Sequence, residues 1–194
     1  GADAEGCLLV SPTGPMVIAR KSGPITLHRL PDYATAGTIF HGTNTITRMD
    51  ALENQGLLVA WCGSSFTNRS LQFWDHRKQE RVWEIQLPPV DRSFAVSTHE
   101  GVVYEVFSDH LIGYDPIRRR SVRRDLDFRN AGRLSFSPDG RWAFCDGRGN
   151  NRLLDAATLR TVAEPKDAGP PHGSDFWADE PRLLFSGCTV LDLE

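Results

Sequence analysis

The residue types that could bind a metal or act as nucleophiles are scattered along the chain. None of the six histidines forms an H-x-x-x-H pair, and no G-x-S-x-G motif marks a serine nucleophile. The four cysteines form no C-x-x-C motif and lie within apolar runs or at turns: Cys7, Cys62, Cys145 and Cys188. We therefore expect no metal, no cofactor and free thiols in a reducing compartment, although the spacing also allows a disulfide pair.

One glycine-rich segment has residues that could hold a phosphate group. The segment is "DGRGNN", residues 146–151. A phosphate-binding loop would be followed by a helix and would end in Lys-Ser or Lys-Thr, and this segment has neither feature. We predict that it forms the turn of a β-hairpin instead.

Six arginines in "PIRRRSVRRDLDFRN", residues 116–130, are the strongest local concentration of charge. Such a cluster could bind phosphate or an acidic partner. It maps, however, to a turn and an outermost strand, where charge prevents pairing between sheet edges. The segment has no interleaved aromatic residues and the chain has a net charge of -3, so we do not expect nucleic-acid binding.

The composition is that of a soluble globular domain. The 194 residues are 40% hydrophobic and 24% charged. No run of about 18 apolar residues could span a membrane, and the first residues have no signal-peptide pattern. We expect one cytoplasmic domain over residues 1–194 with no membrane partner; a secreted or periplasmic chain that has lost its signal peptide would look the same.

A repeat of about 42 residues organises the chain. Gly14 in "SPTG" and Gly140 in "SPDG" are three such periods apart, and Gly56 and Gly101 lie near the two intermediate positions. A fifth copy has Glu180 at this place. Periods of this length indicate stacked supersecondary units, with boundaries near residues 7–45, 46–90, 91–130, 131–170 and 171–194.

Each repeat contains short apolar runs separated by turn residues, which predicts an all-β fold with four strands per repeat. An aspartate follows the third strand in four copies: Asp75, Asp115, Asp155 and Asp192. No segment has a helical apolar period, so we expect almost no helix. A four-stranded sheet cannot bury both faces alone, but sheets arranged radially cover one another.

The segments "FSPDGRW" (136–142), "LLDAATL" (153–159) and "FWDHRKQ" (73–79) resemble β-propellers of the WD-repeat family and related bacterial, quinoprotein-like propellers. Trp74-Asp75 stands where that family has its Trp-Asp pair, whereas its Gly-His pair is missing. The five repeats predict about five blades, which is a low number for this family. The fifth copy stops after its third strand, so we expect either a closed five-bladed ring with an incomplete last blade or part of a larger propeller or multi-domain protein.

The resemblance places the turns between second and third strands, and the loops between blades, on one rim that commonly binds partners. The candidate partner-binding residues are Arg20, Lys21, Asn68, Arg69, Asp109, His110, Asp146, Arg148, Asn150, Asn151 and His172. The inter-blade loops also contribute His41, Asn44, Asp91, Arg92, Arg129 and Asn130. The favoured function is a non-catalytic scaffold that binds a protein or peptide. The alternatives are a hydrolase or lyase with its active site at the channel mouth and a lectin-like carbohydrate binder.

The repeat pattern also predicts mutational effects. Gly140, in the turn between the first and second strands, should need backbone freedom, so replacing it with Val should cost about 1 kcal/mol or more. Replacing Arg119 on the predicted outer edge should cost roughly 0.5 kcal/mol or less.

Overall fold

The structure, a computed structural model, describes residues 6–9, 16–20, 24–29, 32, 34–39, 45–64, 67–89, 92–137, 139–147, 151–164, 183–186 and 189–192. The chain divides into two compact units, Gly1–Asp91 and Arg92–Glu194. This division falls one residue after the end of the second sequence repeat, residues 46–90.

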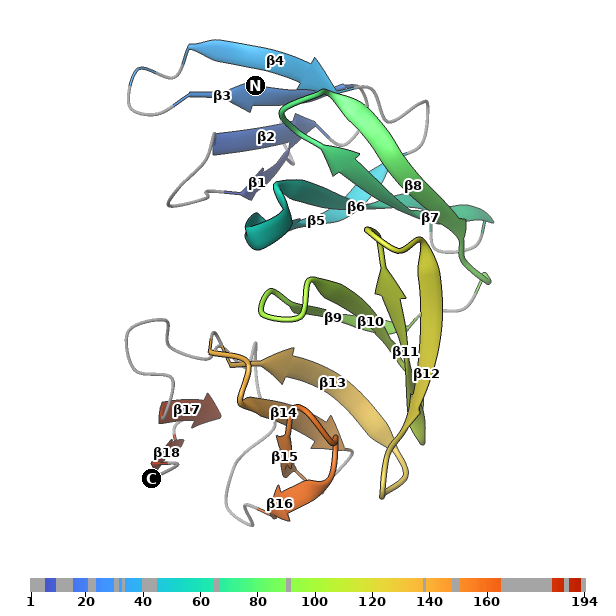
Figure 1. The fold of residues 1–194 in the computed structure, drawn as a ribbon, viewed down its shortest axis with the longest axis vertical. Coiled ribbons are helices and arrows are strands. Elements are labelled where there is room, and N and C mark those ends of the chain that lie inside the picture. The colour runs from blue at the N-terminus through green and yellow to red at the C-terminus, as the bar shows by residue number, and fades with distance from the viewer. Residues whose placement is uncertain are drawn as a thin grey trace. The chain divides into compact units, whose positions relative to one another are not determined.

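The first unit contains two antiparallel four-stranded sheets, each with its strands in chain order (Figure 1). The first sheet consists of β1 (Gly6–Leu9), β2 (Met16–Arg20), β3 (Ile25–His28) and β4 (Thr35–Ile39). The second consists of β5 (Ile46–Leu52), β6 (Leu57–Ser64), β7 (Thr67–Asp75) and β8 (Glu80–Gln86), with a short 3-10 helix, η1 (Glu53–Gln55), between β5 and β6.

The second unit repeats this plan (Figure 1). The third sheet consists of β9 (Ser93–Ser97), β10 (Val102–Val106), β11 (His110–Asp115) and β12 (Arg120–Asp125). The fourth consists of β13 (Ala131–Phe136), β14 (Trp142–Gly147), β15 (Arg152–Asp155) and β16 (Thr161–Ala163). β17 (Leu183–Ser186) pairs with β18 (Thr189–Asp192).

The all-β prediction is confirmed, because η1 is the only helix in the part of the chain that the structure describes. Four predicted sets of four strands form four sheets in the expected order. The predicted first strand of the fifth copy, residues 174–178, lies outside the described residues.

Apolar side chains from neighbouring sheets form one core in each unit. In the first unit, residues of β3 and β4 such as Ile25 and Ile39 share a core with Leu58 and Trp74 of the second sheet. In the second unit, the core joins the third and fourth sheets, and its members are Ala95, Tyr104, Val106, Leu111, Phe128, Leu134, Ala143, Cys145, Leu154, Ala156 and Leu159. The alternation of side chains along each strand therefore leaves one face of the third sheet for this core.

Three of the predicted marker glycines have equivalent backbone conformations, and the fourth, Gly14, lies outside the described residues. Gly56, Gly101 and Gly140 have φ values of 65°, 67° and 71°, a left-handed region that glycine adopts at little cost. A Cβ atom at Gly140 would also lie only 2.3 Å from His99 Cγ in the β9–β10 turn of the neighbouring sheet. Gly140 is thus constrained by its backbone conformation and by its close neighbour.

The aspartates that end the third strand of the second, third and fourth sheets organise equivalent turns. Asp75 Oδ1 accepts hydrogen bonds from the backbone N–H groups of Arg77 and Lys78. Asp115 and Asp155 accept in the same way from the N–H groups of Arg118 and Thr158, at 3.0 and 2.8 Å. The repeated aspartate therefore closes the turn that leads to the outer strand.

The residue four positions after each aspartate has a positive φ: 59° at Gln79, 48° at Arg119 and 58° at Leu159. The arginine-rich segment is confirmed to form a turn and an edge strand, β12. Arg119, however, lies in the turn and not on the strand. The expected low cost of replacing it therefore holds for Gly or Asn, whereas a β-branched residue would be strained there.

We predict that Gly140→Val lowers the free energy of unfolding by about 1–3 kcal/mol, because Val disfavours a positive φ and its Cβ would clash with His99. Urea unfolding followed by circular dichroism measures this. Arg119→Gly is the control, and it should change stability by about 0.5 kcal/mol or less because glycine tolerates the same φ. A Gly140→Val protein as stable as the parent would contradict the assigned turn.

We also predict that the fold loses stability in acid. In Asp75 and Asp115, burial opposes ionisation, but the N–H donors and the nearby Lys78 or Arg118 outweigh it and lower the pKa. In Asp155, hydrogen bonds from the Thr158 hydroxyl and N–H lower the pKa. Since the unfolded chain holds these protons up to a pH of about 4, the stabilisation is complete above that pH and is lost as the pH falls through the lowered values.

Urea unfolding between about pH 3 and about pH 6 tests this dependence. Asp155→Asn keeps an acceptor oxygen but does not titrate, so its stability should depend less on pH than that of the parent. Equal pH dependence in the two proteins would exclude Asp155 as a contributor.

Candidate partner-binding site

The clearest group of sequence-predicted rim residues lies at one end of the third sheet. The register pairs Val106 at the end of β10 with Ser93 at the start of β9. Consequently the segment that enters β9 and the β10–β11 turn lie at the same end of the sheet. The turn is a tight hairpin, in which Phe107 N–H donates to His110 O at 2.9 Å.

A buried carboxylate lies beneath this end. Glu105 interrupts the apolar strand "VVYEV", and alternation places it on the face opposite Tyr104 and Val106. The residue is only 2% exposed. Its Oε2 accepts a hydrogen bond of 2.7 Å from the Tyr114 hydroxyl, and its Oε1 lies 3.4 Å from Arg92 Nε. The Tyr114 hydrogen bond and the ion pair with Arg92 both favour the buried carboxylate, although Arg92 Nε–H itself makes no hydrogen bond to a described residue.

Arg92 links this carboxylate to the β10–β11 turn. Its guanidinium carbon lies 3.7 Å from the centre of the Phe107 ring, a cation–π contact. The Phe107 ring stacks on the His110 ring with their centres 4.3 Å apart. His110 Nδ1 lies 2.7 Å from Asp109 Oδ1, the distance of a hydrogen bond in which the imidazole N–H donates. We call these six residues the rim cluster: Arg92, Glu105, Phe107, Asp109, His110 and Tyr114.

The rim cluster fixes the charge state of two of its members. Burial, and then the hydrogen bond to Glu105, raise the pKa of the Tyr114 phenol, which keeps its proton as a donor. The hydrogen bond with His110 lowers the pKa of Asp109, whose side chain is 52% exposed. The cluster therefore presents an ionised carboxylate above a fixed aromatic stack.

The structure brings together Asp109 and His110 among the predicted site residues. Asn68 is exposed with a φ of 52° in the hairpin that also contains Arg69. Asp146 and the buried Asn151 belong to the β14–β15 hairpin of the fourth sheet. Arg20 ends β2, and its side chain is not described; Lys21, Arg148, Asn150 and His172 lie outside the described residues.

The sequence-based list of site residues omitted Glu105, Phe107 and Tyr114. The signal for Glu105 was present, because a single carboxylate inside an apolar strand needs a buried partner. The sequence contains no such indication for the partners of Glu105, because Tyr114 is brought next to Glu105 only by the pairing of β10 with β11.

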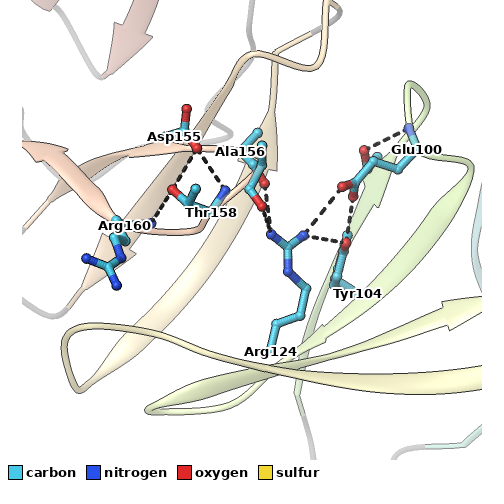
Figure 2. A network of polar contacts seen from close by, with 9 residues as sticks. Glu100, Tyr104, Arg124, Asp155, Ala156, Thr158 and Arg160 are labelled. Carbon is cyan, nitrogen blue, oxygen red and sulfur yellow. Dashed lines mark hydrogen bonds and ion pairs between the residues drawn. The ribbon is translucent and has the colours of Figure 1, made fainter.

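A second polar cluster lies between the third and fourth sheets, around Arg124 of β12 (Figure 2). Its Nη1 donates to the Tyr104 hydroxyl at 2.9 Å and lies 3.4 Å from Glu100 Oε1. Its Nη2 donates to the carbonyl oxygens of Ala156 and Ala157 in the fourth sheet. One guanidinium thus connects the third sheet to the fourth.

The turn after β15, which contains Ala156 and Ala157, is also stabilised by hydrogen bonds within itself. Figure 2 shows Thr158 beside Asp155, whose Oδ1 accepts from the Thr158 hydroxyl at 2.7 Å. A further link between the sheets joins Asp127 to the backbone N–H and hydroxyl of Thr161, at 2.9 and 2.8 Å. These contacts hold the two sheets together at the turns, and none involves the rim cluster.

The two buried cysteine thiols are held in their neutral forms. Cys62 and Cys145 are free, and burial raises the pKa of each thiol to about 12. No group of three His, Cys, Asp or Glu residues in the described ranges could hold a metal ion. Within those ranges, no helix is long and apolar enough to cross a membrane.

Comparison with solved structures defines the class of fold as a propeller-like all-β fold. Hydrazine synthase of Kuenenia stuttgartiensis matches 94% of this chain with a TM-score of 0.67 and 16% identity. The computationally designed Ika8 protein matches 100% of this chain with a TM-score of 0.64 and 14% identity.

The matched region covers 55% of the hydrazine synthase chain and 60% of the Ika8 chain. The chain therefore spans little more than half the length of these structures. At such low identities the likeness concerns the fold alone. No protein-family model and no curated protein matches the sequence.

We predict that Arg124→Ala destabilises the protein by about 1–3 kcal/mol, because the Tyr104 hydroxyl and two carbonyl groups lose the guanidinium as donor. Glu100 keeps the hydrogen bond from the Tyr104 hydroxyl. Arg123→Ala is the matched control on the same strand. Its exposed side chain pairs with the exposed Asp125, so its loss should cost about 0.5 kcal/mol or less. Equal costs in urea unfolding would show that the Arg124 contacts contribute no net stability.

Proposed function

We propose that the chain is a non-catalytic scaffold that binds a protein or peptide at its rim, built as a divergent WD-repeat-like or quinoprotein-like propeller. Three features support this assignment: the repeated four-stranded sheets, the equivalent Asp turns and the Trp74-Asp75 pair. We further propose five blades, the last of which is represented by β17 and β18.

The observation that carries the proposal is the ordering of the rim cluster. Phe107 lies between the Arg92 guanidinium and the His110 ring, and His110 is in turn paired with Asp109. Side chains that are already ordered lose little conformational entropy when a partner binds. A flat aromatic stack beside an exposed carboxylate suits a peptide that supplies both apolar contact and hydrogen-bond donors.

The internal pairing of the cluster favours binding over catalysis. Both oxygens of Glu105 have partners within the cluster, and Tyr114 donates its proton to one of them. Glu105 and Tyr114 therefore stabilise the conformation of the rim cluster. The free thiols of Cys62 and Cys145 support a cytoplasmic location, where cysteines stay reduced.

Selection from a random peptide library displayed on phage, with the immobilised full chain as bait, tests the proposal. Enriched peptides should bind the parent protein. They should bind His110→Ala about ten-fold or more weakly, because removal of the ring dismantles the stack at the centre of the rim. Arg160→Ala is the control. It replaces an exposed side chain in the turn between β15 and β16 of the fourth sheet and should leave affinity for the peptide unchanged.

Peptides that bind both variants equally would place the binding surface elsewhere. A library that yields no binder, together with hits on a glycan array, would favour a carbohydrate-binding protein. Turnover of esters or lactones by the purified chain would favour the hydrolase alternative.

A further inference from the structure

The β11–β12 turn and the edge strand that follows it form the most exposed segment of the described chain. Residues 117–123 are all exposed, the longest such run among the described residues. Two large apolar side chains lie in it, Ile117 at 61% and Val122 at 45% exposure. β12 pairs only with β11, so one side of its backbone faces away from the sheet.

The single hydroxyl in this segment, Ser121, is surrounded by arginines. Arg118, Arg119 and Arg120 precede it directly, and Arg123 follows two residues later. The Ser121 hydroxyl, Arg119 and Arg120 make no side-chain hydrogen bond or ion pair with any residue that the structure describes. Arg118 pairs with Asp115, but its side chain is 68% exposed, and such surface pairs are easily exchanged for another partner.

We propose that Ser121 is a phosphorylation site for an arginine-directed serine/threonine protein kinase. Kinases of this class recognise guanidinium groups two and three residues before the acceptor through acidic groups in the substrate groove, by charge-assisted hydrogen bonds. Arg119 and Arg118 occupy those two positions. The exposed Val122 supplies an apolar contact directly after the acceptor.

The reaction transfers the γ-phosphoryl group of ATP. The Ser121 Oγ–P bond forms as the bond between the γ-phosphorus and the β,γ-bridging oxygen breaks, and ADP leaves. The hydroxyl proton passes to the catalytic carboxylate of the kinase and then to solvent.

The surroundings would also stabilise the phosphorylated product. Ser121 and Arg123 project from the same face of β12, because they are two residues apart. Arg123 pairs with the exposed Asp125 at 2.8 Å. A phosphate with about two negative charges would attract Arg123 and Arg120, and would offset much of the positive charge of the segment.

The equivalent positions of the neighbouring sheets lack these features. In the second sheet, Arg81 stands near the position of Ser121. In the fourth sheet Thr161 does, but its hydroxyl donates to Asp127 at 2.8 Å, and Thr158 and Leu159 replace the two arginines. Thr161 is therefore a matched control within the same chain.

An extended substrate groove requires an extended backbone, but Arg119 has a φ of 48° because it lies in the β11–β12 turn. The turn must therefore open, and the first residues of β12 must separate from β11, before the segment can enter the groove. An edge strand that pairs with one neighbour can open locally without unfolding the sheet. The folded protein is consequently the appropriate substrate for the test.

The full chain is incubated with the catalytic subunit of cyclic-AMP-dependent protein kinase, magnesium and ATP. Intact mass and fragmentation spectra should show one phosphate, on Ser121. Ser121→Ala should abolish it, and Thr161→Ala should not change it. Arg118→Ala and Arg119→Gly should each lower kcat/KM by about ten-fold or more, because each removes a charge-assisted contact; glycine at position 119 keeps the positive φ.

Three outcomes would overturn the proposal: an unmodified Ser121 while a standard peptide substrate is phosphorylated, a rate unaffected by loss of either arginine, or phosphorylation that occurs only after unfolding in urea. Circular dichroism of each variant confirms that it is folded before its rate is compared. The result is independent of whether the rim cluster binds peptides.

Discussion

The burial of apolar faces between neighbouring sheets is the constraint on which this structure depends. A four-stranded sheet of about 40 residues is too small to form a core of its own, so its apolar face needs a second sheet. Residues such as Leu111 and Leu154 meet in one core although they lie in different repeats. The polar contacts at the turns, above all those of Arg124, act on sheets that this packing has already brought together.

The turns give the repeat its regularity. A glycine with positive φ follows the first strand of the second, third and fourth sheets, and an aspartate ends the third strand of each. The glycine and the aspartate each satisfy a backbone requirement within their own turn, so the same turn can recur in several sheets. The residues that the turns do not need for this purpose can differ between the sheets, as they do in the third sheet.

The third sheet carries two different surfaces as a result. At one end, Glu105 and Tyr114 hold Arg92 and the aromatic stack in place from within. At the other end, the run of arginines around Ser121 is held by few contacts and is exposed over seven residues. The first surface is ordered before any partner arrives, whereas the second is accessible and easily remodelled, and these properties suit recognition and modification respectively.

The sequence alone determined the elements, because their causes are local. Apolar runs of four to six residues, marker glycines and repeated aspartates predicted the strands, the turns and their order, and the structure confirms them. The sequence also placed Asp109 and His110 at a hairpin turn, because the two residues are adjacent in the chain. Only the tertiary structure could join Glu105 to Arg92 and Tyr114, or Arg124 to Ala156, because strand pairing and sheet packing create those distances. The tertiary structure also shows that Arg119 lies in a turn and not on the predicted outer edge, because the pattern of apolar residues does not reveal a single positive φ.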